Sequence, residues 1–159
     1  LTRSDDSSDD QSSTTAITSA STLAGETTTT ATTVAIDPAQ AASDQLQQLI
    51  TQDRPTVDTL VGGWVVQLSA KRVGLKADGI EYGPVEILAD HTTLRDTYGA
   101  ILVDAGAFQF QSDGSPMVGW FLTIVSQTFA AKVDAAQWCT DNGLAANRCL
   151  ARRFPSPAT

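Results

Sequence analysis

The stretch Trp64-Val65-Val66-Gln67-Leu68-Ser69-Ala70-Lys71 decides the fold that this sequence predicts. Alternate residues from Trp64 to Ala70 are apolar, whereas Gln67, Ser69 and Lys71 are polar. A period of two residues is typical of a strand with one buried face and one face toward solvent. We therefore expect residues 64–71 to form a strand of a sheet that is covered on one side.

Downstream of this strand the pattern alternates between helix and strand. From Pro84 to Tyr98 the apolar residues recur at helical spacing, and Gly99 is typical of a helix end. The remaining segments give the following predicted elements: strands over 100–110, 117–125 and 147–154, and a helix over 128–142. The order β-α-β-β-α-β predicts an α+β fold of the ferredoxin or RNP type. Such a fold has a four-stranded antiparallel sheet with two helices on one face and an open second face.

Upstream, Asp37-Pro38 is a helix start, because Asp caps an N-terminus and Pro suits the first helical position. Arg54-Pro55 is expected to stop this helix. Residues 1–36 are rich in Ser, Thr and Asp, so we expect a disordered linker, either a plain spacer or an O-glycosylated stalk. The predicted divisions are this linker, a helical segment over 37–61, a domain over 62–155 and a tail over 156–159. Because the chain begins with Leu1, we expect an upstream signal or membrane anchor.

The composition excludes several classes of protein. Among 159 residues there are 10 Lys+Arg against 18 Asp+Glu, which gives a net charge of -8. This charge argues against nucleic acid and against an anionic membrane surface as partners. One His and two Cys argue against a zinc site, and we expect no metal and no cofactor. No run of about 18 apolar residues exists, so we expect no transmembrane segment in this chain.

The two cysteines lie in neighbouring predicted elements. Cys139 falls in the second helix and Cys149 in the last strand. In an extracellular domain they would form one disulfide. Two buried thiols or a redox pair are the alternatives, although the C-x-x-C spacing of redox motifs is absent.

No catalytic constellation is apparent. His91 lies on the apolar stripe of its predicted helix, so we expect a packed histidine with one hydrogen-bond partner. Asp90 and Asp96 fall on other faces of that helix, and no nucleophile signature accompanies the imidazole. We therefore expect a protein that is not an enzyme.

The open face of the sheet is the candidate binding site. The residues that we place at this site are Gln67, Ser69, Lys71, Phe121, Thr123 and Arg152. Amide, hydroxyl, ammonium and aromatic groups together suit a sugar polymer, and basic residues such as Arg152 would attract a carboxylate. The alternatives are an ordinary solvated face and a basic edge that discourages sheet pairing.

Two resemblances accompany these patterns. The stretches WVVQLSAK (64–71) and GWFLTIVSQTFAAKVDAAQWC (119–139) resemble SPOR (sporulation-related repeat) domains, with Gln67 at the family's Gln position. The resemblance implies a module that is not an enzyme and that binds peptidoglycan glycan strands through its sheet face, behind a disordered linker. Ser69-Ala70-Lys71 stands where that family has Gly-Ser-Phe. The chain also looks like extracellular modules of actinobacterial envelope proteins, some of them attached to receptor-type Ser/Thr kinases.

These observations favour a binding module on the extracellular side of the bacterial cell envelope, tethered by an upstream anchor. The expected partner is peptidoglycan. The alternative is a protein-interaction or sensory ectodomain that binds an envelope protein and no glycan. The sequence carries no signal for an oligomeric state.

Overall fold

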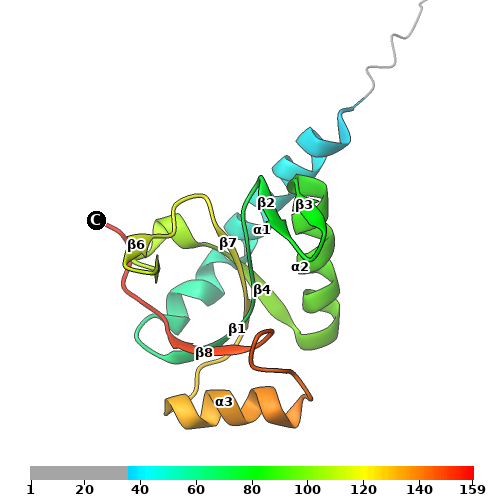
Figure 1. Ribbon diagram of the computed structural model, residues 1–159. Coiled ribbons are helices and arrows are strands. Elements are labelled where there is room, and N and C mark those ends of the chain that lie inside the picture. Colours follow the sequence, from blue (N-terminus) through cyan, green and yellow to red (C-terminus); the bar gives the residue numbers. More distant parts are fainter. Residues whose placement is uncertain (1–35) are drawn as a thin grey trace, which may run out of the picture. The chain divides into compact units, whose positions relative to one another are not determined.

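The computed structural model describes residues 36–159, which belong to one compact unit (Figure 1). The predicted linker therefore lies, apart from Ile36, outside the described residues. The elements in chain order are α1 (Pro38–Leu60), β1 (Trp64–Lys71), β2 (Leu75–Ala77), β3 (Ile80–Tyr82), α2 (Pro84–Tyr98), β4 (Ala100–Asp104), the 3₁₀ turn η1 (Ala105–Ala107), β5 (Gln111–Ser112), β6 (Ser115–Pro116), β7 (Phe121–Val125), α3 (Lys132–Asp141) and β8 (Leu150–Arg153).

The protein has an α+β fold built on a four-stranded sheet. The strands lie in the order β4-β7-β1-β8, and each neighbouring pair is antiparallel. The predicted four-stranded antiparallel sheet is therefore confirmed. The strands are shorter than predicted, because β4 ends at Asp104 and β7 begins only at Phe121.

Two small hairpins extend from the sheet. Strands β2 and β3 pair around Asp78-Gly79, and β5 and β6 pair around Asp113-Gly114. Each Asp and each Gly in these turns has a positive φ, between 51 and 76°. Asp-Gly is the dipeptide that tolerates this geometry in a two-residue hairpin turn. Neither hairpin was predicted as a pair of strands.

Helices α2 and α3 pack on one face of the sheet. Val66 and Leu68 of β1 contact Ala135 and Cys139 of α3 in one apolar cluster, and Tyr98 at the end of α2 packs against it. Figure 1 shows α2 and α3 at different ends of the sheet.

The second face of the sheet is covered, so the predicted open face is wrong. Val65 of β1 and Leu122 and Ile124 of β7 lie at 0% exposure in an apolar cluster with the end of α1 and with the segment after β4. The covering residues of this cluster are Val57, Leu60, Phe108, Phe110, Met117 and Phe154. The open face was predicted from the polar residues of β1. Strand β7 carries apolar residues on both of its faces, so both faces of the sheet need a cover.

Helix α1 does not stop before Pro55, as the sequence predicted, but continues to Leu60. Pro55 lacks the N–H that would bond one turn back, which costs about 3 kcal/mol in a helix interior. Val57 and Leu60 beyond it are each 2% exposed. Burying two such side chains stabilises the fold by about 3–6 kcal/mol, which offsets the defect.

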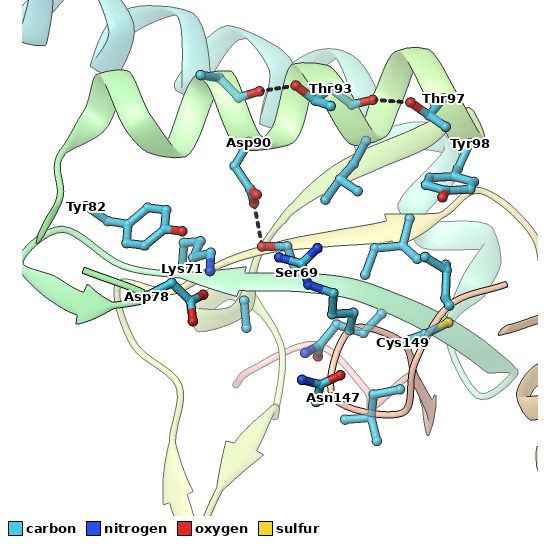
Figure 2. A pocket seen from close by; sticks show the side chains of 18 of the residues that line it. Ser69, Lys71, Asp78, Tyr82, Asp90, Thr93, Thr97, Tyr98, Asn147 and Cys149 are labelled. Carbon is cyan, nitrogen blue, oxygen red and sulfur yellow. Dashed lines mark hydrogen bonds between the residues drawn. The ribbon is translucent and has the colours of Figure 1, made fainter. Parts of the chain in front are cut away.

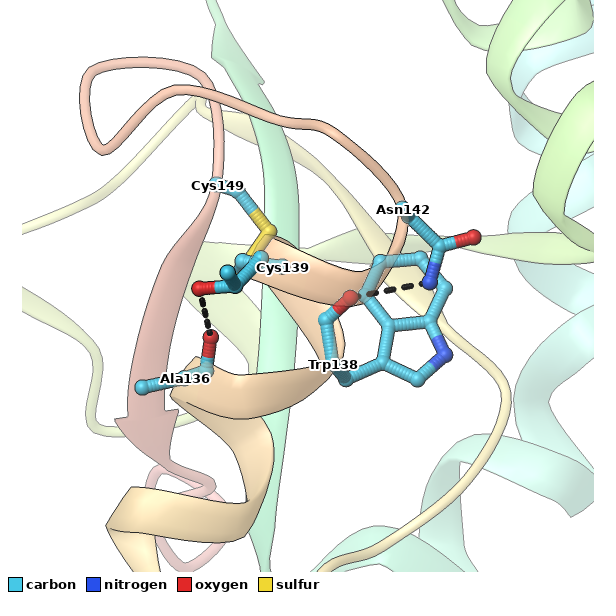
Figure 3. The surroundings of a disulfide bond; sticks show 6 residues. Ala136, Trp138, Cys139, Asn142 and Cys149 are labelled. Atoms are coloured by element: carbon cyan, nitrogen blue, oxygen red, sulfur yellow. Dashed lines mark hydrogen bonds between the residues drawn. A yellow bond between two sulfur atoms is a disulfide. The ribbon is translucent and has the colours of Figure 1, made fainter.

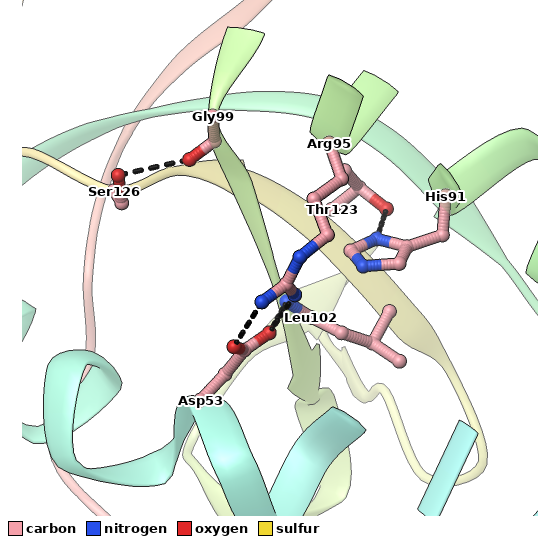
Figure 4. Close-up of polar contacts among 7 residues, drawn as sticks. All are labelled: Asp53, His91, Arg95, Gly99, Leu102, Thr123 and Ser126. Carbon is pink, nitrogen blue, oxygen red and sulfur yellow. Dashed lines mark hydrogen bonds and ion pairs between the residues drawn. The ribbon is translucent and has the colours of Figure 1, made fainter. Parts of the chain in front are cut away.

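Asp53 joins α1 to the outer edge of the sheet (Figure 4). Its carboxylate accepts two hydrogen bonds from Arg95 of α2, at 2.7 and 3.0 Å, and one from the backbone N–H of Leu102 in β4, at 2.8 Å. Asp53 is only 4% exposed. Because β4 is an outermost strand, this carboxylate satisfies an N–H that has no neighbouring strand.

We predict that Asp53→Asn destabilises the fold by about 3 kcal/mol, because it leaves Arg95 without its buried carboxylate. The control is Asp58→Asn in the same helix, whose ion pair with Arg54 is about half exposed and is expected to contribute less than about 1 kcal/mol. Urea unfolding measures both variants. Equal losses of stability would show that Asp53 has no special structural role.

Candidate functional site

A β-bulge in the middle of β1 changes which residues share a face. Gln67 lies opposite Ile124 of β7, but the next paired residue is Ser69, opposite Thr123, so Leu68 is the extra residue. A bulge of one residue reverses the alternation after it. Gln67 therefore lies on the face covered by α1, whereas Ser69 and Lys71 lie on the face covered by α2.

The side-chain contacts of these residues agree with the register. Ser69 Oγ donates to Asp90 of α2 at 2.6 Å, and the Lys71 ammonium lies 4.2 Å from the centre of the Tyr82 ring. On the opposite face, the Gln67 side-chain carbonyl accepts from Arg152 at 2.7 Å. The predicted common face of Gln67, Ser69 and Lys71 is therefore wrong.

The other three predicted site residues, Thr123, Phe121 and Arg152, contact other residues of the fold. Thr123 is 3% exposed and bonds to His91, and Phe121 packs against the cluster formed by α1 and α2. The Arg152 guanidinium lies 4.6 Å from the Phe110 ring centre, and burial lowers its pKa. These three residues do not line the large groove described below.

A groove of about 850 Å³ runs along the exposed edge of β1, and we call it the edge groove (Figure 2). Residues 67–71 of β1 form its floor. Its walls come from α2, from the β2–β3 hairpin and from residues 144–150. Gln67, Ser69 and Lys71 therefore come together here, although not on one sheet face.

The groove exists because β8 covers only half of β1. Trp64–Gln67 pair with Leu150–Arg153, whereas residues 68–71 have a strand neighbour only on the β7 side within the described residues. About half of the N–H and C=O groups of an antiparallel strand face each neighbour. The backbone of residues 68–71 therefore presents unpaired groups toward the groove.

The disulfide determines where β8 begins. Cys139 of α3 and Cys149, just before β8, are joined, so the predicted disulfide is confirmed (Figure 3). The chain between them turns close to α3: Leu144 N–H donates to Cys139 O, and the Asn142 side chain donates to Trp138 O. Because Cys149 is bound to α3, the chain joins the sheet only at Leu150.

The charged groups in the edge groove differ in their hydrogen bonds and ion pairs. Asp90 accepts the Ser69 hydroxyl, and Glu86 accepts the Gly83 N–H at 2.9 Å. Lys71 and Arg148 form no ion pair with the residues that the structure describes. Asp78, in the turn of the β2–β3 hairpin, has no ion-pair partner within 36–159 either.

His91 is a packed histidine with one hydrogen-bond partner, as predicted. Its Nδ1 lies 3.0 Å from the Thr123 hydroxyl, and its buried Nε2 has no partner among the described residues. Burial lowers the pKa of His91 below its ordinary value of 6.5, and the Arg95 guanidinium lowers it further, while Asp53 and Asp90 oppose this shift. The lowered pKa favours the neutral imidazole at neutral pH. Among residues 36–159, no group of three or more His, Cys, Asp or Glu side chains could hold a metal ion.

Sequence reasoning missed Tyr82, Tyr98 and Asn147, which also line the groove. One signal for part of it was present, because Asp78-Gly79 between two short apolar segments is the pattern of a hairpin. No local signal identifies a strand whose partner ends early. That property depends on where the disulfide holds a distant segment.

The chain was compared with protein-family models, with curated proteins and with solved structures, and none of them matches. The resemblance to SPOR domains therefore stays a prediction from the sequence. The function has to be argued from the groove and its residues.

We predict that replacing Cys139 and Cys149 together by Ala destabilises the fold by about 2–3 kcal/mol, as expected for a short closed loop. Thermal unfolding measures the effect. Reductant is expected to lower the Tm of the wild-type chain and to leave that of the double variant unchanged. If reductant lowered both values equally, the disulfide would not be the cause.

Stability is also predicted to fall on acidification through His91. The unfolded chain takes up a proton near pH 6.5, whereas the buried imidazole resists it to lower pH, so stability is lost as the pH falls below about 6.5. Between about pH 7.5 and 5.5 we expect a loss of up to about 1 kcal/mol in urea unfolding. His91→Gln is expected to lose less stability over this range, and an identical loss in both proteins would contradict the assignment.

Proposed function

We propose that this chain is a non-catalytic binding module of the bacterial cell envelope that holds an extended polymer in the edge groove. The observation that carries the proposal is the groove itself, which follows β1 over residues 67–71. A long groove with mixed polar and aromatic walls suits a chain-like ligand better than a compact one. The charged side chains of the groove do not form a recognisable catalytic arrangement.

The disulfide supports a location outside the cytosol. Disulfides persist in oxidising compartments such as the bacterial periplasm and the cell surface, and are rare in the cytosol. Cys139 and Cys149 are both buried, at 6% and 7% exposure, as in a structural disulfide. Within 36–159, no helix has the length and apolar character needed to cross a bilayer.

A ferredoxin-like or RNP-like fold with α1 as an additional helix is also part of the proposal. The strand order and the packing of α2 and α3 on one face support it. A SPOR-like origin would explain this arrangement. The binding site would then differ from the sheet face that SPOR domains use. Here the end of α1 and the side chains of Phe108, Phe110 and Phe154 cover the corresponding surface.

Peptidoglycan is the first candidate ligand. The edge groove offers the Asn147 amide, the half-buried ring of Tyr98, and the hydroxyl oxygens of Thr93 and Thr97, which serve as acceptors because their protons are donated to carbonyls of α2. These groups suit acetamido and hydroxyl groups and the flat faces of sugar rings. The uncompensated Arg148 suits a carboxylate of the polymer.

A protein partner is the second candidate, as for an interaction or sensory ectodomain. The observation that favours it is the edge of residues 68–71, which has no strand partner on the groove side among residues 36–159. Sugars do not present the regular N–H and C=O spacing that a strand edge matches, whereas an extended peptide does.

We predict that filling the groove abolishes binding to purified cell-wall sacculi. Ala146, an exposed groove residue, is changed to Trp, and Ala136→Trp on the exposed side of α3, outside the groove, is the matched control. Cosedimentation of Ala146→Trp is expected to fall at least about tenfold relative to the control. Equal retention of both variants would place any sacculus contact elsewhere, and no retention of the wild-type chain would remove peptidoglycan as the ligand.

A further inference from the structure

We infer that the edge groove receives an extended polypeptide of a partner protein, which adds to β1 at residues 68–71 as a further strand. This inference rests on the proposed function, because it assumes that the edge groove is the binding site, and it names the class of ligand. The added strand would lie next to residues 68–71 of β1, on the side where β8 pairs with residues 64–67.

The lining of the groove shows that its floor is a strand edge and not a sheet face. Five consecutive residues, Gln67 to Lys71, all border it. Successive side chains of a strand point to opposite faces, so a groove on one face would be bordered by alternate residues only. Even with the bulge at Leu68, residues from both faces reach the same space. The backbone edge between them therefore borders that space.

The other sheet edges are less suited to strand addition. The edge of β4 is satisfied by Asp53 and is covered by α1, which packs along it. The outer edge of β8 carries the exposed Arg153, and a free charged side chain on an edge strand discourages pairing, whereas Lys71 of β1 is partly buried and lies over the Tyr82 ring. Residues 68–71 thus combine a backbone edge that has no strand partner among residues 36–159 with a groove beside it.

The size of the edge suits a short segment. Four residues at about 3.3 Å each span about 13 Å, which is within the usual length of a strand. The α2 and hairpin walls stand on one side of the edge and residues 144–150 on the other. A bound strand would therefore be flanked on both sides.

The walls also specify the side chains of the ligand. Ile80 and Leu150 border the groove and are 45% and 48% exposed, so they offer apolar contacts. Of the groove's charged groups, Lys71 and Arg148 form no ion pair and Asp78 is the one carboxylate without a partner, as far as residues 36–159 are concerned. Neutral donors leave Glu86 and Asp90 charged, so the carboxylates that border the groove outnumber the cations, and positive charge is local to Lys71 and Arg148. An extended segment with apolar residues and an acidic side chain close to Arg148 fits this surface.

The test uses a phage-displayed library of random peptides selected on the immobilised full chain. We expect selected peptides to be rich in β-branched residues and to share one acidic residue that can lie close to Arg148. The tightest one is then synthesised with its native backbone and, as a matched twin, with alternate amide nitrogens methylated. Methylation removes N–H donors and keeps every side chain and charge, so we expect it to weaken binding at least about tenfold.

Three variants of the chain complete the design. Ala146→Trp fills the groove and is expected to abolish binding of the peptide. Arg148→Glu is expected to weaken binding about tenfold, and Lys132→Glu, an exposed charge reversal on α3 outside the groove, is expected to leave it unchanged. Amide hydrogen exchange of residues 68–71 is expected to slow when the peptide is bound.

The outcomes separate this inference from the proposed function. Equal binding of the methylated and native peptides, selection of no peptide, or self-association of the chain through the groove would overturn strand addition. If sacculi bind in a way that depends on Ala146 while no peptide is selected, the groove is a glycan site and only the inference fails. If neither sacculi nor peptides bind, the proposed function fails with it.

Discussion

The bond between the Asp53 carboxylate and the Leu102 N–H determines how the outer edge of this sheet is completed. A strand at the edge of a sheet presents backbone groups that need a partner, and here a side chain from α1 supplies one. The same carboxylate holds Arg95, so α1, α2 and β4 meet at one buried point. Helix α1 can then lie against α2 with its first half and cover the far face of the sheet with its second.

The opposite side of the sheet is organised differently. There, β8 pairs with only the first half of β1, because the disulfide holds Cys149 against α3 until the chain reaches Leu150. The bulge at Leu68 falls at the point where this pairing ends. One edge of the sheet is thus closed by a buried carboxylate and the other is left partly open beside a large groove. The candidate site follows from this asymmetry.

The candidate site was only partly predictable. Ser69 and Lys71 were identified as polar residues of β1, and both border the groove. Thr123 was placed on an open face because it alternates with apolar neighbours, yet it is buried beneath α2 and bonds to His91. Alternation shows that a strand has two different faces, but it does not show which face a later helix covers. A one-residue bulge is also invisible in the alternation, because Leu68 is itself apolar.

The sequence by itself predicted the strands of the four-stranded sheet and the helices α2 and α3 in their order, but neither of the two small hairpins. It also predicted the disulfide between Cys139 and Cys149, because periodicity depends on neighbours along the chain and the two cysteines lie only ten positions apart. Only the tertiary structure decided that α1 runs through Pro55, that both faces of the sheet are covered, and that β1 keeps a free edge. Each of these depends on contacts between distant segments, where the burial of Val57 and Leu60 or the position of Cys149 outweighs the local preference.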